Sequence, residues 1–425
     1  MSNVVSMSLP TINAGVSRGF YKEVRATVVQ WNNSALTNAA AVDGNFNGET
    51  EYKFSTAFNQ RVHMDKSYFA VTDFLYDGAT LVATTPTCAA ARTWNHCSAL
   101  FQNMQIDING TNVENINEVA EVDSYCKRVE YDESYFKNIG ECFNLKYAYG
   151  VTNGSDSISR HTDAMANPKT TYLWHPNCSG IFQQTLPQNL DISIKMRPAA
   201  NKHFRVVDGV AATDPGVVVD TFRYGVSEIL LYVYITEESN APRDTEIKLD
   251  LRPVFPAKVT WTGAATLTYN YNVPATTYQM GIVLASSTRN TDTLFSPTIF
   301  KCETNKQDFL SYRIKYASYD FPQFQITEVA AQRFYRGYLN GALDFSKDVN
   351  FNGGESYAFW REQGPMYNFD VIKRADDHST IAEVTLTAPA AFNGEDVYLM
   401  CRHSRVVIIG YGSDGRVTNV SAENA

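Results

Sequence analysis

The sequence predicts an all-β protein built from two successive β-sandwiches, each with one short helix. Apolar and polar residues alternate along several short segments, and pairs rich in Asn, Asp and Gly separate these segments. The 425 residues also include 25 Tyr and 24 Phe, and aromatic and β-branched side chains favour the pleated surface of a strand. Short strands with turn signals between them favour sandwiches or barrels over alternating βαβ units.

Individual strands are predicted from the period of the pattern. Strict alternation at 104–108, 190–196, 247–251 and 382–386 is typical of a strand that buries one face and exposes the other. Two apolar runs, ILLYVYI at 229–235 and VVII at 406–409, predict strands covered on both faces. Turns are expected at Asn109-Gly110, Asp208-Gly209, Asn352-Gly353-Gly354 and Asn393-Gly394.

Only two segments have helical periodicity. In the first, 117–132, apolar side chains recur at steps of three and four residues at Val119, Val122, Cys126 and Val129. The second spans 330–339, where two aromatic residues lie four positions apart. Each helix follows a strand near the middle of its half of the chain.

A polar segment in the centre, 236–246 (TEESNAPRDTE), has the composition of a linker. It divides the chain into pieces of similar size, and each piece contains one helix and ends on a strongly apolar strand. We interpret this as an internal duplication, although two unrelated β domains are the alternative. A repeated sandwich of about 200 residues with one helical excursion fits a jelly roll. The predicted organisation is an arm at residues 1–20, a first jelly roll at 21–238 and a second jelly roll at 239–425.

Charge and cysteine content restrict the function classes. The net charge is −9, and the longest Lys/Arg clusters are pairs, so direct nucleic-acid binding is not expected. The seven Cys are odd in number and irregularly spaced, which favours free thiols in a reducing compartment over a disulfide framework. No signal peptide is recognisable, and the longest apolar run is far shorter than the ~18 residues of a membrane span. We therefore expect a soluble protein made in the cytosol.

The motif Gly410-x-Gly412-x-x-Gly415 has the spacing of a dinucleotide-binding fingerprint. That fingerprint needs a helix directly after the glycines, because the N–H groups of the helix N-terminus hold the pyrophosphate. The ten residues after Gly415 leave no room for a helix and a second strand. The Asp414-Gly415 pair between β-rich runs instead predicts a hairpin, with strands at 405–409 and 416–420.

Two groups of His and Cys could bind zinc. His96-Cys97 and His175 with Cys178 together would supply four ligands, but the paired Cys-x-x-Cys or His-x₃₋₅-His spacing of structural zinc sites is absent from them. Cys401 and His403 lie two residues apart on one face of a predicted strand, and packing or an interface explains them better than ligation. We predict no metal site and no cofactor.

Catalytic signatures are equally weak. Asp376, Asp377 and His378 fall in KRADDHST, which is expected to form an exposed turn, where the two carboxyl pKa values would not be driven apart. No His-Glu-x-x-His, Gly-x-Ser-x-Gly or phosphate-loop motif occurs. We predict no catalytic residues and no enzyme activity.

Three passages resemble a known family: VPATTYQMGIVLASS at 273–287 with the following 292–298, the strand, turn and helix pattern at 312–341, and IDINGTNVENINEV at 106–119. They resemble the double jelly-roll major capsid proteins of icosahedral DNA viruses, particularly the smaller ones of polinton-like viruses and virophages. The resemblance implies two upright jelly rolls per chain and a homotrimer whose six rolls form a pseudo-hexagonal tile. It also implies neighbouring capsomers, pentons and minor or cement proteins as partners, and a place in the virion after synthesis in the host cytoplasm.

Two other function classes remain open at this stage. Jelly rolls also build lectins, so a carbohydrate-binding module is the main alternative, although lectins are usually secreted. Another virion part, a penton or spike, is less suited because a penton usually needs one roll. Residues 143–180, rich in Gly, Ser, Asn and Asp, are the candidate for an outward-facing loop in the first half.

Overall fold

The computed structural model describes most strands of the chain and two helices. The described residues are 18–28, 36–37, 49–77, 80–81, 88–92, 94–131, 135, 139–143, 145, 169–199, 204–208, 222–237, 246–286, 311–317, 319–326, 366–371, 379–388, 391 and 393–424. Among them, no helix is long and apolar enough to cross a membrane.

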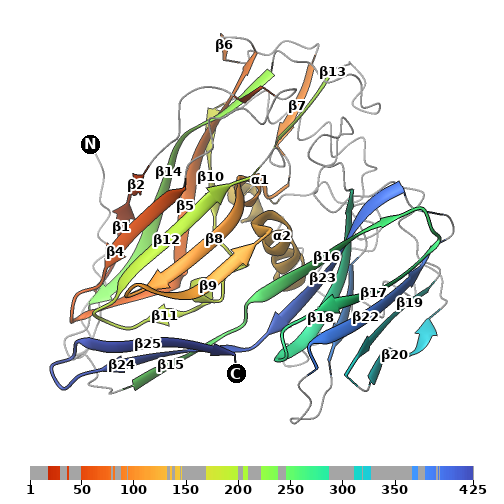
Figure 1. The fold of residues 1–425 in the computed structure, drawn as a ribbon. Helices are drawn as coiled ribbons and strands as arrows, with labels where there is room; N and C mark the ends of the chain where they lie inside the picture. Colours follow the sequence, from red (N-terminus) through yellow and green to blue (C-terminus); the bar gives the residue numbers. More distant parts are fainter. Residues whose placement is uncertain are drawn as a thin grey trace.

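The first half folds into two facing sheets (Figure 1). Sheet I has the strand order β1-β14-β5-β10 and sheet II the order β4-β12-β8-β9, with short β2 pairing with β4 at the edge. Numbered along the chain, the eight long strands therefore read 1-8-3-6 and 2-7-4-5, which is the wrapping of a jelly roll. Their bounds are β1 (Arg18–Val24), β2 (Ala26–Val28), β4 (Thr50–Ser55), β5 (Gln60–Asp77), β8 (Phe101–Ile108), β9 (Thr111–Asn117), β10 (Lys169–Trp174), β12 (Asp191–Pro198) and β14 (Phe222–Glu237).

Short strands extend this roll. β3, β6 and β11 pair with the long strands of sheet I, whereas β7 and β13 form a separate two-stranded ribbon. Their bounds are β3 (Leu36–Thr37), β6 (Thr80–Leu81), β7 (Cys88–Arg92), β11 (Thr185–Leu186) and β13 (Phe204–Asp208).

The second half repeats the wrapping of the first. Sheet III has the order β16-β23-β18-β21 and sheet IV the order β17-β22-β19-β20, so its eight strands again read 1-8-3-6 and 2-7-4-5. The predicted pair of tandem jelly rolls is confirmed. The bounds are β16 (Val254–Thr262), β17 (Thr266–Asn272), β18 (Thr277–Ser286), β19 (Ser311–Tyr316), β20 (Tyr319–Ile326), β21 (Met366–Asp370), β22 (Ile381–Thr387) and β23 (Asn393–His403).

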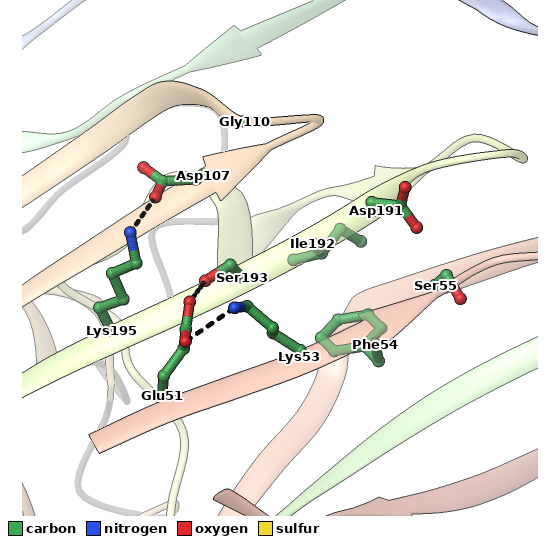
Figure 2. A pocket seen from close by; sticks show the side chains of 10 residues that line it. All are labelled: Glu51, Lys53, Phe54, Ser55, Asp107, Gly110, Asp191, Ile192, Ser193 and Lys195. Carbon is green, nitrogen blue, oxygen red and sulfur yellow. Dashed lines mark hydrogen bonds and ion pairs between the residues drawn. The ribbon is translucent and has the colours of Figure 1, made fainter. Parts of the chain in front are cut away.

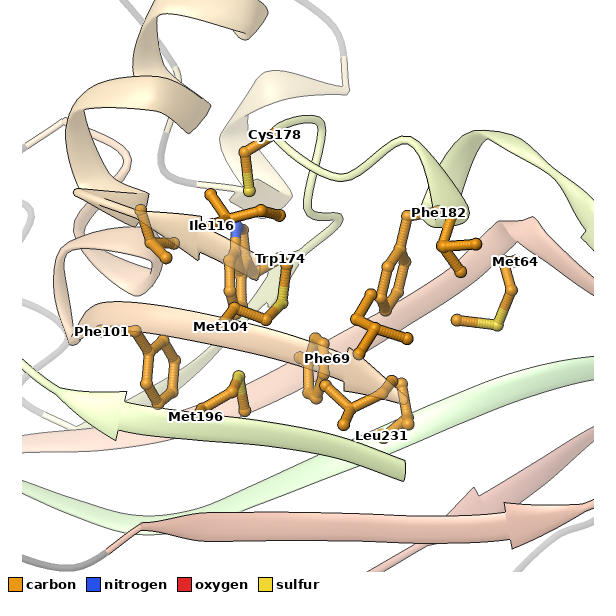
Figure 3. Packing of buried hydrophobic residues seen from close by; sticks show 14 of the residues in the cluster. Met64, Phe69, Phe101, Met104, Ile116, Trp174, Cys178, Phe182, Met196 and Leu231 are labelled. Carbon is orange, nitrogen blue, oxygen red and sulfur yellow. The ribbon is translucent and has the colours of Figure 1, made fainter. Parts of the chain in front are cut away.

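The alternating segments place one face of each strand in a core, as predicted. In β12, Ile192, Ile194 and Met196 are buried while Ser193 and Lys195 on the opposite face are partly exposed. The first core lies mainly between sheets I and II and contains stacked aromatic rings (Figure 3). Phe69 and Phe101 each stack on the Trp174 ring, at centroid distances of 5.2 and 5.3 Å. The second core lies between sheets III and IV.

Helix α2 (Val119–Glu130) confirms the helix predicted at 117–132 and follows β9 along the chain. Its four periodic apolar residues pack into or against the first core. The second predicted helix, 330–339, has the equivalent place between β20 and β21 but lies outside the described residues. The four-residue helix α1 (His96–Ala99) was not predicted, because a single turn shows no period.

A separate three-stranded sheet joins the two halves. β15 (Glu246–Leu251) pairs with β24 (Arg405–Tyr411), which pairs with β25 (Val417–Asn424); we call this the base sheet. It precedes and follows the second roll in sequence, yet its buried side chains, including Leu249, Val407 and Ile409, belong to the first core. Strands from the predicted second domain thus complete the core of the first half, and the boundary at 238/239 stays a prediction.

Two local expectations are wrong or only half met. Asn393 and Gly394 were expected in a turn, but they begin β23, where the register shifts and Gly394 adopts a φ of 91°. The run 229–235 was expected to be covered on both faces. Its residues alternate between buried and partly exposed, so the chain itself covers only one face fully. The Asn109-Gly110 turn between β8 and β9 is confirmed, with φ of 49° and 79°.

Candidate assembly surfaces

The glycine motif near the C-terminus forms the predicted hairpin. β24 and β25 are antiparallel, the N–H of Gly412 donates to the Arg416 carbonyl oxygen at 2.8 Å, and the N–H of Gly415 donates to the Gly412 carbonyl oxygen at 2.9 Å. Gly415 has a φ of 74°, a conformation that glycine adopts without steric cost. A strand follows where a phosphate-binding helix would be needed, so these glycines make a turn.

The hairpin is fixed against the first half. The Asn189 side-chain amide donates to the Gly415 carbonyl oxygen at 2.6 Å, and the Tyr411 hydroxyl donates to the Gln188 carbonyl oxygen at 2.9 Å. Both contacts join residues more than 200 positions apart in sequence. The base sheet is therefore held by specific hydrogen bonds as well as by its buried apolar face.

Two of the four candidate zinc ligands, His96 and His175, are engaged in other contacts. His96 Nε2 lies 3.0 Å from an Asp73 carboxylate oxygen, and both side chains are fully buried. His175 Nδ1 lies 2.8 Å from the Ser67 carbonyl oxygen, and burial lowers the pKa of His175. Burial also raises the pKa of the Cys178 thiol well above its ordinary value. Among the described residues, no three His, Cys, Asp or Glu side chains come together as a metal site.

Cys401 and His403 lie two positions apart on β23, and both side chains are buried. The Cys401 side chain packs in the second core, where burial raises its pKa. His403 follows two positions later, and burial lowers its pKa to about 4, which keeps the ring neutral near neutral pH. Asp376, Asp377 and His378 lie outside the described residues. Cys97, Cys126, Cys142, Cys178 and Cys401 form no disulfide, which agrees with the expectation of thiols.

Both faces of sheet III contribute side chains to a hydrophobic core. One face, with Met280, Ile282 and Leu399, packs into the second core. Alternate residues on the same strands, among them Val283 and Met400, belong to the first core. We call this second face the outer face of sheet III. The two rolls therefore share an apolar contact that buries the central strands of this outer face, whereas Lys258 and Thr260 on the edge strand β16 stay exposed.

Helix α2 provides the polar contacts of this junction and lies between the rolls (Figure 1). The Tyr125 hydroxyl donates to the Asn368 side-chain oxygen on β21 at 2.9 Å. Glu130 accepts from the Arg402 guanidinium on β23 at 2.8 Å. Gly281 on β18 leaves space for the tyrosine, because a Cβ there would lie 2.5 Å from the Tyr125 hydroxyl oxygen. These contacts fix the orientation of one roll on the other.

A buried polar network holds α2 in the first half. One Asp123 carboxylate oxygen accepts from the Lys127 ammonium at 2.7 Å, the Asn95 amide at 2.9 Å and the Trp174 indole at 3.0 Å. The other oxygen accepts the backbone N–H of Cys178 at 3.1 Å. Asp123 and Lys127 are almost fully buried, so the network replaces the hydration that both charges lose.

A second buried carboxylate, Glu114 on β9, fixes the segment after β10. It accepts hydrogen bonds from the Ser179 hydroxyl and from the backbone N–H groups of Gly180 and Ile181. Burial raises the Glu114 pKa, and these hydrogen bonds partly oppose that effect. The network is structural, because Glu114 is only 1% exposed and has no access to a substrate.

The outer face of sheet I carries a cluster of tyrosines. Tyr21 on β1 lies opposite Tyr234 on β14, and Tyr232 on β14 lies opposite Tyr68 on β5. The ring centroids of these pairs are 5.0 and 5.5 Å apart, and Tyr21 also contacts Tyr68 at 5.6 Å. Tyr21 is 48% exposed and the other three are partly exposed. We call these four side chains the tyrosine face.

The outer face of sheet II differs, because it is polar. Figure 2 shows a groove there, of roughly 490 Å³, in which the charged side chains contact one another. Lys195 donates to Asp107 at 2.8 Å, and Glu51 accepts from Lys53 at 2.9 Å and from the Ser193 hydroxyl at 2.7 Å. The ion pairs with Lys195 and Lys53 help to lower the pKa of Asp107 and Glu51, outweighing the opposite effect of their burial.

Comparison with known proteins relates this architecture to viral capsids. No family model matches the chain, and no curated protein matches it. The structure is similar to the crystal structure of the mavirus major capsid protein, with a TM-score of 0.51 and 9% identity over 95% of this chain and 90% of that one. It is also similar to a chain in the cryo-EM structure of the Sputnik virophage, with a TM-score of 0.53 and 11% identity over 100% and 91%.

The chain has the double jelly-roll fold of these viral proteins. The fold-level resemblance drawn from the three sequence passages is thereby confirmed. In the double jelly roll, the surfaces that can meet neighbours are sheet faces and loop ends, and the tyrosine face is the most aromatic of the described outer faces. Sequence reasoning missed this face, since the four tyrosines come from three separate strands. That Tyr232 lies opposite Tyr68 can be known only once the register between β14 and β5 is known.

Proposed function

We propose that this protein is a major capsid protein whose copies form trimeric, pseudo-hexagonal capsomers of an icosahedral DNA virus. The observation that carries the proposal is the exact repetition of one strand order in two rolls that share a buried junction. A rigid pair of similar rolls supplies two of the six walls that a hexagonal tile needs, so three copies complete it. The capsid proteins with the same fold support this role.

The proposal includes a division of the chain and a set of partners. Residues 1–20 serve as an arm, residues 21–238 as the first roll and residues 239–425 as the second. Capsomers meet further capsomers, pentons and minor or cement proteins, and the virion is the final location after synthesis in the host cytoplasm. No catalytic, metal or cofactor role and no direct nucleic-acid binding is part of this proposal.

The carbohydrate-binding alternative is not favoured by the sheet II groove. Sugar sites usually present an exposed aromatic ring for stacking, whereas Phe54 in this groove is only 6% exposed. The charged side chains around it already pair with one another. The groove is therefore better explained as a solvated sheet face.

Two measurements test the proposed function. Light scattering on the purified chain should give the mass of a trimer, about three times 47.5 kDa, and negative-stain images should show hexagonal outlines. A stable monomer at every concentration, without such particles, would contradict the proposal. Retention of that monomer on a glycan column would instead support the carbohydrate-binding alternative.

A further inference from the structure

The two rolls present equivalent outer faces, and among the described residues only that of sheet III has a covering layer. Sheets I and III have the same strand order, with β5 and β14 in the first roll corresponding to β18 and β23 in the second. The outer face of sheet III is buried against the first half, with Tyr398 and Met400 fully covered. The corresponding face of sheet I carries the tyrosine face, which stays at least partly exposed; of the described side chains, Lys66 lies over one of its rings, with the ammonium 5.3 Å from the centroid of Tyr234.

The side chains of the tyrosine face have the chemistry of an interface. Tyrosine combines a large apolar ring with a polar hydroxyl and is enriched where proteins meet. The rings contact one another along three strands, so they present a continuous surface. Its edge is charged: Arg25 forms ion pairs with Glu23 at 2.8 Å and with Glu228 at 3.8 Å. An apolar centre with a polar rim is the usual anatomy of a protein interface.

We propose that the tyrosine face binds the second half of another copy of this chain, in the way that the outer face of sheet III binds the first half of its own chain. The inference rests on the proposed function, because it assigns the contact that closes the capsomer. Within a chain, the second roll packs through its outer sheet on the first roll. Repeating that step from one copy to the next gives a head-to-tail contact, and such contacts form a closed ring when the rotation permits.

The first test changes one exposed residue of this face. Tyr21→Glu should leave the fold intact, because Tyr21 is 48% exposed, but it places a carboxylate in the proposed interface. Phe58→Glu is the matched control, since Phe58 is 49% exposed and lies in the turn between β4 and β5, outside both the tyrosine face and the second half. Light scattering over a dilution series and the thermal midpoint are measured for both variants.

We expect the trimer association constant of Tyr21→Glu to fall at least about thirtyfold, the size of an interface hot spot, while that of Phe58→Glu matches the wild type. A folded Tyr21→Glu chain that still forms trimers as tightly as the wild type would overturn the inference and leave the proposed function intact. A wild-type chain that is monomeric throughout would overturn both.

A second measurement locates the contact directly and does not require the trimer to be weakened. A photo-crosslinking phenylalanine at position 232 replaces one aromatic ring by another, so the face keeps its shape. Irradiation of the trimer should join two copies, with the crosslinked peptide of the second copy lying within 239–425. Crosslinks only within one chain, or only to the first half of the second copy, would contradict the proposed head-to-tail contact.

Discussion

Gly281→Ala is predicted to disturb the junction between the rolls. The added Cβ would lie 2.5 Å from the Tyr125 hydroxyl oxygen and 2.6 Å from the Asn368 side-chain oxygen, whereas ordinary contacts begin near 3.4 Å. Tyr125 and Asn368 are both buried and are hydrogen-bonded to each other, so neither side chain can move away freely. Overpacking of this kind costs about 1–3 kcal/mol, and the strained hydrogen bond adds roughly 1 kcal/mol. We expect the free energy of unfolding to fall by about 2–4 kcal/mol.

Denaturant unfolding followed by fluorescence measures this loss. Gly410→Ala is the control, because a Cβ at Gly410 would meet its nearest neighbour at 3.4 Å and should change stability by less than about 0.5 kcal/mol. Tyr125→Ala removes both the hydroxyl and the ring carbon, 2.6 Å away, that the new methyl group would meet, so the double variant should lose about 1–2 kcal/mol less than the sum of the single losses. Strict additivity, or a Gly281→Ala chain as stable as the wild type, would refute the reasoning.

Three further predictions concern other parts of the fold. Replacing Asp123 by Ala leaves the Lys127 ammonium buried without its counter-ion, which should cost about 3–5 kcal/mol; a thermal midpoint close to the wild type would contradict the described network. The buried His403 ring has its pKa lowered to about 4 from 6.5, so unfolding takes up a proton between these values. The stability that His403 contributes is complete above pH 6.5 and is lost as the pH falls through 4, by up to about 3 kcal/mol. When the free energy of unfolding of both chains is measured between pH 7 and pH 4, this decrease should be missing in His403→Gln. Gly415→Ala should cost about 1–2 kcal/mol, because its φ of 74° is unfavourable for alanine, and equal stability of the Gly415 and Gly410 alanine variants would argue against the hairpin geometry.

Much of the fold was predictable because the signals that specify it are local. The alternation in 190–196 and 382–386 reports which face of each strand is buried, and that face is the same whichever sheet the strand joins. The helix at 117–132 was predictable for a similar reason, since its apolar stripe repeats within twelve residues. The duplication could be inferred from the order of such elements, without sequence identity between the halves.

The remaining features depend on contacts between distant residues. The apolar run at 229–235 predicted a strand buried on both faces, but within the chain its second face carries partly exposed tyrosines. Gly394 carries a turn signal, yet it lies in a bulge because β16 extends past it. The junction between the two rolls was less predictable still, since its hydrogen-bonded residues Tyr125 and Asn368 are 243 positions apart and neither belongs to a motif.

The base sheet also sets the order in which the molecule can be completed during synthesis. Val407, Ile409 and Val420 belong to the first core, although more than 150 residues of the second roll separate them from β14. The ribosome must therefore deliver the whole second roll before the hydrophobic interior of the first can close. Until then the part of the first core that the base sheet covers is open to water, so an interrupted chain would remain recognisable to chaperones and proteases.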